Sequence, residues 1–289
     1  MNEFQKRTLF GALYIICVVG SILWSPIAFS TLFWIICVLA VDEFHRLVGS
    51  SGMLRIGAFI ATTALWTLAQ WFLLSPVISK DQPSWGIFFG LAYAPLLLIW
   101  MLDEIWNHSG RPVQNWGNLL CSQAMIALPL CSMSMLMKID KWLLLALFVL
   151  IWINDTGAYC VGSLTAKRPQ GNHKMAPHVS PKKSWEGLIG GIVFTLIGSL
   201  VLLACGWFDR IAQGGWTILL VLLFGILVSA FGTMGDLMES LLKRSVGVKD
   251  SGVFLPGHGG VLDRFDSILL AAPVITAYSW LCYFLLPLL

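Results

Sequence analysis

The chain has 289 residues, of which 57% are hydrophobic and only 11% are charged, and its mean hydropathy is +0.80. Soluble domains carry about 25% charged residues, and a water-soluble chain of this length could not bury so much apolar side chain, so a soluble class is excluded. The formal net charge of +3 is too small to indicate a nucleic-acid partner.

Nine apolar stretches follow one another along the chain and predict an all-α, polytopic membrane bundle with a polar funnel facing the cytoplasm. Ser25-Pro26 separates the first two stretches either as a tight turn or as a kink in one long helix, so eight helices remain the alternative. The stretches run over about 9–24, 27–41, 57–74, 86–102, 116–137, 142–162, 187–207, 216–233 and 267–286.

The charged residues indicate how these helices are organised. Residues 1–140 are expected to form about five structural helices that face lipid or a dimer partner, and residues 141–289 a catalytic region with charged loops at 163–186 and 236–266. With nine helices and an inside N-terminus, most of the 18 Lys and Arg residues lie on the cytoplasmic side. We therefore expect an integral membrane protein whose two charged loops face the cytoplasm.

Charged residues also end the second stretch, where Asp42, Glu43, His45 and Arg46 stand close together. We interpret this group as interfacial charge without a chemical role. The seven cysteines contain no C-x-x-C pair, so neither a zinc site nor a disulfide framework is expected.

The first polar block begins inside the sixth stretch, where Asn154 and Asp155 stand toward its end. A carboxylate is costly in the membrane and usually faces the bundle interior, so Asp155 is expected to face a metal or a phosphate, with structural pairing to a Lys or Arg as the alternative. Ser184 is expected to cap the next helix with Glu186 in its first turn, at an N-terminus that would bind an anion. Close helix packing is expected at Gly187, Gly190, Gly191 and Gly198.

The second polar block is richer in charge. On a helix, Asp236, Glu239, Ser240 and Lys243 share one face. Asp263 and Asp266 are again three residues apart, and two carboxylate pairs joined by a Gly- and Pro-rich turn could converge on a divalent cation. Neighbouring Lys and Arg side chains and the backbone N–H groups of residues 257–260 suit phosphate oxygens. The alternative is a solvated loop between two membrane helices.

The second block has many specified residues at fixed spacing. It reads Ser240-x-x-Lys243-Arg244, Lys249-Asp250-x-Gly252 and Leu255-Pro256-x-His258-Gly259-Gly260-Val261-x-Asp263-Arg264-Phe265-Asp266. This pattern is similar to the C-terminal motif of the CDP-diacylglycerol synthases, also called phosphatidate cytidylyltransferases, and the first block resembles the same family in the expected order. The resemblance covers roughly residues 150–270, and the stretch 163–172 departs from it by its greater length and by Ser163 in place of a basic residue.

The resemblance implies a Mg²⁺-dependent membrane nucleotidyltransferase that joins CTP to phosphatidic acid among membrane lipids, giving CDP-diacylglycerol and pyrophosphate. It is compatible with a homodimer, and it implies a location in the bacterial inner membrane with the active site facing the cytoplasm. It implies that Asp236 and Asp263 bind Mg²⁺, and that Asp155, Glu239 or Asp266 support it or a second cation, monovalent or divalent. The catalytic group would be Asp236, Asp263, Lys243, Arg264 and Asp266. Substrate would be bound by Asn154, Asp155, Lys174, Ser180, Lys182, Lys183, Ser184, Glu186, Ser240, Arg244, Lys249, Asp250, His258, Gly259 and Gly260.

Other classes compete with this interpretation. An ion-coupled transporter also buries carboxylates, but it tends to show repeated halves, whereas the dense charge here is confined to the C-terminal half. An inactive scaffold would need no complete set of charged motif residues. A CDP-alcohol phosphotransferase would require a D-G-x-x-A-R core, which the chain lacks.

Overall fold

The computed structural model describes residues 3–74, 85–102, 104–107, 110–212, 214–252 and 259–285. The chain forms two compact units. Unit 1 comprises Met1–Met135 together with Asp250–Asp263, and unit 2 comprises Leu136–Lys249 and Arg264–Leu289. Residues 250–263, which the sequence assigned to the catalytic region, therefore lie with the N-terminal helices.

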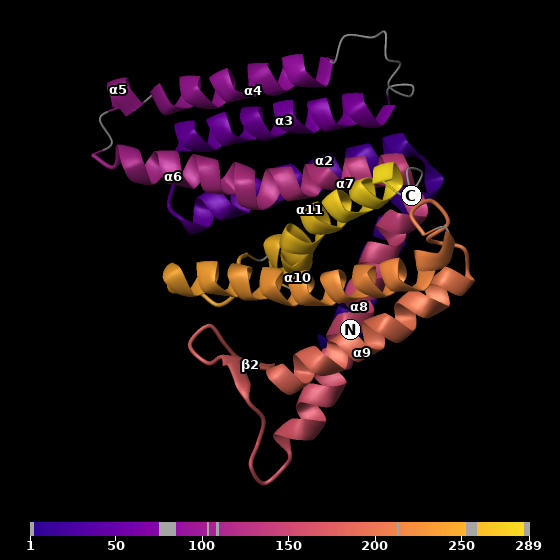
Figure 1. Ribbon diagram of the computed structural model, residues 1–289. Coiled ribbons are helices and arrows are strands. Elements are labelled where there is room, and N and C mark those ends of the chain that lie inside the picture. Colours follow the sequence, from indigo (N-terminus) through magenta and orange to yellow (C-terminus); the bar gives the residue numbers. More distant parts are fainter. Residues whose placement is uncertain are drawn as a thin grey trace. The chain divides into compact units, whose positions relative to one another are not determined.

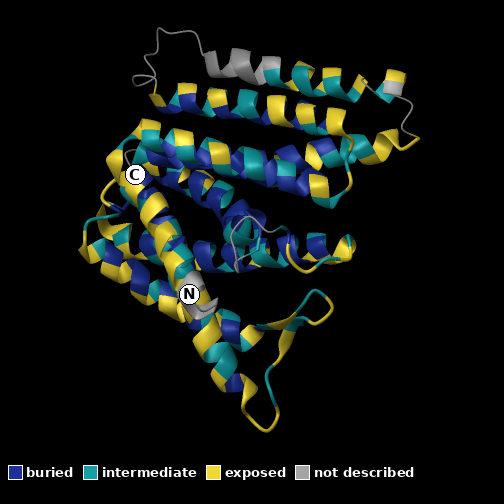
Figure 2. Cartoon of the chain, turned by 180° about the vertical axis from the view of Figure 1, so that it is seen from behind, coloured by how far each residue is buried: buried dark blue, intermediate teal, exposed yellow. Residues whose placement is uncertain are grey.

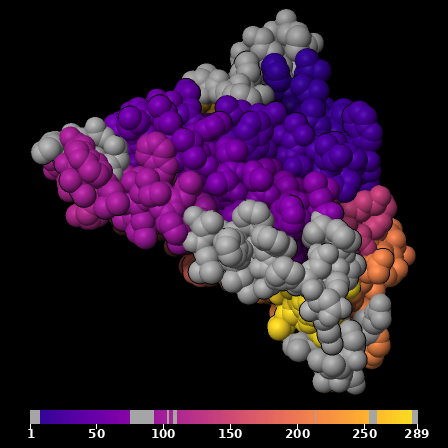
Figure 3. Space-filling view, turned by 90° about the horizontal axis from the view of Figure 1, so that it is seen from above, coloured from indigo at the N-terminus to yellow at the C-terminus, as the bar shows by residue number. Residues whose placement is uncertain are grey.

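Unit 1 is a set of packed helices. Its helix α2 packs against α1 and α3, and α3 packs against α4 (Figure 1). The bounds are α1 Glu3–Trp24, α2 Pro26–Leu47, α3 Gly52–Leu74, α4 Trp85–Leu102, α5 Glu104–Asn107, α6 Pro112–Ser122, a π-turn η1 Gln123–Ala127, and α7 Leu128–Ile139, which runs on into unit 2. The indigo to purple segments of this unit fill one continuous face in Figure 3.

The junction between α1 and α2 is a turn. Ser25 has extended backbone (φ −164°, ψ 156°), its hydroxyl accepts a hydrogen bond from the N–H of Ala28, and Pro26 begins α2. Because a Ser N-cap and a Pro at the first helical position both start a new helix, two separate helices are present and the kinked single helix is excluded.

Polar side chains link the helices inside unit 1. Gln123, at the π-turn, donates to Thr62 Oγ1 at 3.1 Å and accepts from Tyr93 OH at 2.8 Å. Gln70 donates to Ser134 at 2.7 Å. Such hydrogen bonds hold helices together where apolar burial cannot, because lipid is as apolar as the helix surfaces.

Unit 2 consists of long helices and one small hairpin. The chain leaves α8, forms an antiparallel hairpin and returns alongside α8 as α9, with the hairpin beside the start of α9 (Figure 1). The bounds are α8 Lys141–Ala166, β1 Lys174–Ala176, β2 Ser180–Ser184, α9 Trp185–Ala204, a 3₁₀ turn η2 Gly214–Trp216, α10 Thr217–Ser245 and α11 Leu262–Leu285, whose first two residues belong to unit 1.

Glycines set the close approach of α8 and α9, as predicted. A Cβ at Gly190 would lie 2.5 Å from the side chain of Val161, and one at Gly191 would overlap the amide oxygen of Asn154. Gly187 and Gly198 likewise face α8. Any side chain at these positions would push the two helices apart.

Helices α10 and α11 run antiparallel within unit 2. A Cβ at Gly235 would lie 2.6 Å from the backbone oxygen of Asp266, and the hydroxyl of Tyr278 donates to the backbone oxygen of Leu220 at 2.8 Å. The tight contact at Gly235 brings the turn that carries Asp236 beside the turn that carries Asp266.

The helices have the dimensions of membrane spans. Within the described residues, seven helices are long and apolar enough to cross a membrane, and Thr8–Trp24 is a shorter apolar helix. Within the described residues, helices cover most of each of the nine predicted stretches. Exposed residues, many of them large and hydrophobic, line the helix surfaces (Figure 2). The all-α, polytopic membrane class is confirmed, with the β1–β2 hairpin as an addition that the sequence did not predict.

Candidate active site

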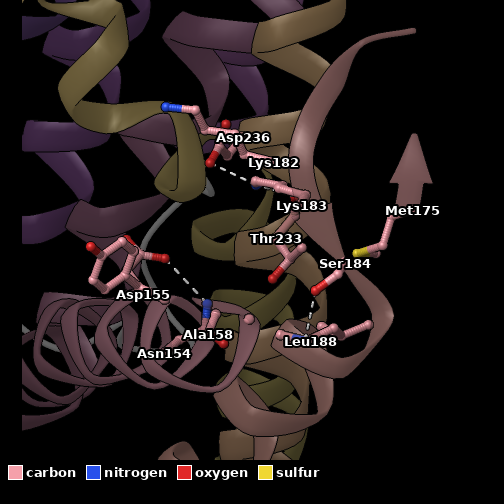
Figure 4. Close-up of a pocket in the computed structure, with 13 residues that line it drawn as sticks. Asn154, Asp155, Ala158, Met175, Lys182, Lys183, Ser184, Leu188, Thr233 and Asp236 are labelled. Carbon is pink, nitrogen blue, oxygen red and sulfur yellow. Dashed lines mark hydrogen bonds and ion pairs between the residues drawn. The ribbon is translucent and has the colours of Figure 1, made fainter. Parts of the chain in front are cut away.

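A cavity of about 290 Å³ opens in unit 2 between α8, the hairpin, the start of α9 and α10 (Figure 4). Of the predicted site residues it contains Asn154, Asp155, Lys182, Lys183, Ser184 and Asp236. The other lining residues are Ala158, Tyr159, Gly162, Met175, Gly187, Leu188 and Thr233.

An ion pair crosses this cavity. The ammonium of Lys183, at the end of β2, lies 2.6 Å from Asp236 Oδ2 on α10 and also donates to the backbone oxygen of Thr233 at 3.2 Å. Figure 4 shows the pair spanning from the hairpin to α10. Thr233 stands one helical turn before Asp236, so this turn of α10 faces the cavity. Sequence reasoning missed Thr233, although its place three residues before Asp236 was a usable signal.

Asn154 and Asp155 form the opposite wall. Asn154 is buried, its amide oxygen accepts from the hydroxyl of Ser229 at 2.5 Å, and its amide nitrogen donates to Asp155 Oδ1 at 3.3 Å. Asn154 thus ties α8 to α10 and orients the carboxylate of Asp155 (Figure 4). The polar partner of Asp155 is an amide, while Lys183 lies within electrostatic range.

The first turn of α9 closes the cavity. Ser184 has extended backbone and its hydroxyl accepts from the N–H of Gly187 at 3.1 Å, which confirms the predicted N-cap. The N–H of Trp185 donates to the backbone oxygen of His173 at 3.0 Å. Since these two N–H groups already have partners, an anion here would be attracted by the positive end of the helix and by the two lysines.

The side chain of Glu186 binds His173 and does not face the cavity. Its carboxylate accepts from the backbone N–H of His173 at 3.0 Å and contacts His173 Nδ1 at 2.6 Å. It therefore holds the segment that leads into β1, and it does not line the cavity.

The predicted polar face of α10 is confirmed. Glu239, Ser240 and Lys243 are buried and Asp236 is half-buried. Lys243 Nζ lies 2.6 Å from Glu239 Oε2, and the hydroxyl of Ser240 donates to Asp236 Oδ1 at 3.3 Å. Lys243 thus neutralises a carboxylate of its own helix, and it lies outside the cavity lining.

Four carboxylates of unit 2 are electrostatic neighbours near the polar face of α10, namely Asp155, Asp236, Glu239 and Asp266. Asp266 on α11 lies within electrostatic range of Asp236, Glu239 and Asp155. Oxygen donors of this kind suit Mg²⁺, which usually takes one or two carboxylates and completes its shell with waters and substrate phosphates. Within the part of the chain that the structure describes, no three His, Cys, Asp or Glu side chains lie close enough together to form a metal site from protein ligands alone. The two carboxylates that line the cavity fit a cation shared with substrate.

The other predicted residues lie outside the cavity. Arg244 donates to the backbone oxygens of Val179 at 3.4 Å and Val248 at 2.9 Å, which ties the end of α10 to the hairpin turn. Lys174 and Lys249 are exposed, and Ser180 and Arg264 are half-buried. Asp250, Gly259, Gly260 and Asp263 belong to unit 1, and His258 lies outside the described residues. The pairing of Asp236 with Asp263 would join two units and stays a prediction.

Two carboxylates accept hydrogen bonds from the glycine turn before α11. The N–H of Gly260 donates to Asp263 Oδ2 at 2.8 Å, and the N–H of Val261 donates to Glu43 Oε2 at 2.7 Å. The N–H of Gly260 thus has a carboxylate acceptor within the chain, and the expectation that residues 257–260 offer their N–H groups to phosphate stays a prediction. The interpretation of Glu43 as interfacial charge is wrong, since its side chain is buried against this turn.

Comparison with known proteins decides the family. A model of the cytidylyltransferase family matches residues 5–282. The chain belongs to the cytidylyltransferase family. It is 47% identical over 128 residues to a phosphatidate cytidylyltransferase of Staphylococcus haemolyticus (strain JCSC1435) and 45% identical over 128 residues to one of Staphylococcus aureus (strain COL). Each match covers 44% of this chain and 45% of the relative, so it spans less than half of these curated proteins. Neither comparison supports the transporter alternative.

Proposed function

We propose that the chain transfers the cytidylyl group of CTP to phosphatidic acid, forming CDP-diacylglycerol and pyrophosphate. One observation carries the proposal: a cavity in unit 2 combines two carboxylates, Asp155 and Asp236, with two ammonium groups, Lys182 and Lys183. Nucleotidyl transfer needs this mixture, because catalysis of phosphate chemistry is mostly positioning and charge neutralisation. The names of the staphylococcal relatives agree with this activity.

The lysines are the phosphate ligands in this proposal. Lys182 and Lys183 would donate to phosphate oxygens, assisted by the positive end of α9 beneath Ser184. Asp155 and Asp236 would hold Mg²⁺ together with the triphosphate, and Asp266 would add negative charge nearby. Bound Mg²⁺ supplies neutralisation of phosphate charge and a more electrophilic α-phosphorus.

The transfer itself is a substitution at phosphorus. An oxygen of the phosphatidic acid phosphate bonds to the α-phosphorus of CTP, and the bond from that phosphorus to the oxygen bridging the β-phosphate breaks. Pyrophosphate leaves with the electron pair. The phosphate monoester is already an anion near neutral pH because its second pKa is about 6, so the site needs no strong general base.

The membrane setting suits a lipid substrate. The apolar surfaces of α8 and α9 would leave the acyl chains in the bilayer while the head group enters the cavity. We propose that the cavity faces the cytoplasm across the bacterial inner membrane, which the distribution of Lys and Arg supports. A homodimer stays a prediction of the family resemblance.

The direct test uses the full chain purified in detergent with CTP labelled at the α-phosphate, phosphatidic acid and Mg²⁺. We expect labelled CDP-lipid that depends on all three. Asp236→Asn should lower kcat/KM by about 100-fold or more, the scale of losing one group that stabilises transition-state charge. Asp209→Asn, an exposed carboxylate outside the cavity, serves as the control and should retain wild-type activity. Wild-type rates from a folded Asp236→Asn protein would overturn the assignment.

A further inference from the structure

Glu43 is a carboxylate inside an apolar helix. It lies on α2, within the candidate membrane span Pro26–Leu47, and only 9% of its surface is exposed. A charged side chain in such a place is costly unless it has strong partners. Both of its oxygens accept hydrogen bonds within unit 1, one from the hydroxyl of Ser251 and the other from the N–H of Val261 at 2.7 Å.

These two partners, Ser251 and Val261, lie near the two ends of the segment 251–263, which is part of the second charged block. Ser251 precedes residues 253–258, and Val261 follows them shortly before α11 begins. Asp263 makes a parallel set of contacts, since its Oδ2 accepts from the backbone N–H of Ser251 at 3.0 Å and from that of Gly260 at 2.8 Å. Two carboxylates, one from α2 and one from α11, thus hold the ends of the segment 251–263 together.

The glycines of this segment are matched to Glu43. A Cβ at Gly252 would lie 3.1 Å from Glu43 Cδ, and a Cβ at Gly260 would overlap Glu43 Oε1. A side chain at Gly260 would therefore displace the carboxylate and break its hydrogen bonds. At these two positions the motif needs glycine because Glu43 lies there, which gives the pattern a structural reason separate from phosphate binding.

The preceding residue shows by contrast what an interfacial carboxylate does on this helix. Asp42 pairs with Arg55 at 2.5 Å and with Arg46 one turn along α2. These side chains are all partly exposed. Asp42 thus has the role that the sequence suggested for the whole group, and Glu43 has a different one.

We infer that Glu43 is a positioning residue for the transfer reaction: by holding both ends of the segment 251–263, it fixes the start of α11 and the carboxylate of Asp263. The inference rests on the proposed function, and it assigns to α2 a part in the reaction beyond anchoring in the membrane. Glu43 acts through the segment 251–263 and not by binding substrate.

The experiment has one arm that needs no substrate and one that does. Hydrogen exchange of the full chain in detergent, without ligand, follows the amides of Ser251 and Val261. We expect Glu43→Ala to speed exchange at Val261 by about tenfold or more, the factor expected for one lost hydrogen bond to a charged group. Asp42→Asn, the control at the neighbouring residue, should leave the exchange rate at Val261 unchanged. Because this arm needs no activity, it distinguishes failure of the inference from failure of the proposed function.

In the second arm, kcat per folded protein should fall in the order wild type, Glu43→Gln, Glu43→Ala, since Gln keeps one acceptor oxygen and the shape. The affinity for CTP should change less than kcat. If Glu43→Ala fails to fold, Glu43→Gln and Ser251→Ala test the inference in its place. Each should speed hydrogen exchange at the amide of Val261 and lower kcat. Unchanged exchange in these variants overturns the inference, and so does faster exchange with wild-type kcat in an active protein.

Discussion

At the scale of single residues, Lys183 shows how a side chain obtains a partner that sequence spacing does not give. It stands on a hairpin strand, 53 positions before Asp236 on α10, and the two meet at 2.6 Å. The sequence placed both residues in the site because each belongs to a charged block, but it could not pair them. The pair is half-buried, so it is less screened by solvent than a surface ion pair.

Lys183 can be tested against a lysine of the same hairpin. Lys183→Met should lower kcat/KM for CTP by about 10- to 100-fold, because it removes a charged donor from the phosphate site. Lys174→Met changes an exposed lysine on β1 outside the cavity, to which the family resemblance gives a substrate contact, and it should lower kcat/KM less than Lys183→Met does. Steady-state kinetics with labelled CTP measure both. Equal loss of kcat/KM in the two variants would contradict a specific phosphate contact of Lys183, because any lysine of the hairpin would then contribute the same positive charge.

Residue chemistry was predictable where it followed from local pattern. Asp155 was expected to face the site because a carboxylate in an apolar helix needs a reason, and Ser184 was expected to cap α9. Glu43 is likewise a carboxylate in an apolar helix, but its partners Ser251 and Val261 lie 208 and 218 positions away in the sequence. A contact over that distance in the chain leaves no periodic signal.

At the scale of helices and strands, the positions of the long helices were predictable because they lie over the nine apolar stretches of the sequence. Their ends were not. Helix α10 continues to Ser245, twelve residues beyond the apolar stretch that ends at Thr233, and it includes the helical face expected for Asp236, Glu239, Ser240 and Lys243. The β1–β2 hairpin was missed because strands of three and five residues, one with the sequence Ser-Pro-Lys-Lys-Ser, show no apolar alternation.

Packing of α8 against α9 gives a prediction at this scale. Gly191→Ala should destabilise the protein by about 1–3 kcal/mol, the usual cost of overpacking, because the new methyl group overlaps the amide oxygen of Asn154, which binds Ser229. Thermal unfolding in detergent measures this change. Gly215→Ala has open space around it and should leave the unfolding midpoint unchanged. A Gly191→Ala protein as stable as wild type would contradict the close contact.

At the scale of the whole molecule, the division of the chain differs from its order in sequence. Residues 250–263 carry part of the charged motif yet belong with the N-terminal helices, while α8 to α10 and most of α11 form the other unit. Sequence reasoning divided the chain once, near residue 140, because hydropathy contains no information on which distant segments pack together.

The membrane orientation gives a prediction for the intact protein. Lys174 precedes α9 and Arg210 follows it, so single cysteines at these positions should lie on opposite sides of the membrane. In a background without native cysteines that retains activity, Lys174→Cys should react with an impermeant maleimide only from the cytoplasmic side, and Arg210→Cys only from outside. Labelling of both from one side would contradict the expected orientation.

The contact of Glu43 with residues 251 and 261 also bears on biosynthesis. Translation adds about 5–20 residues per second, so α2 leaves the ribosome roughly 10–40 s before its partner segment, 208 positions later. During that interval the nascent membrane protein contains a carboxylate whose final hydrogen-bond donors do not yet exist. The surroundings of Glu43 on α2 are therefore completed only after synthesis has passed residue 261.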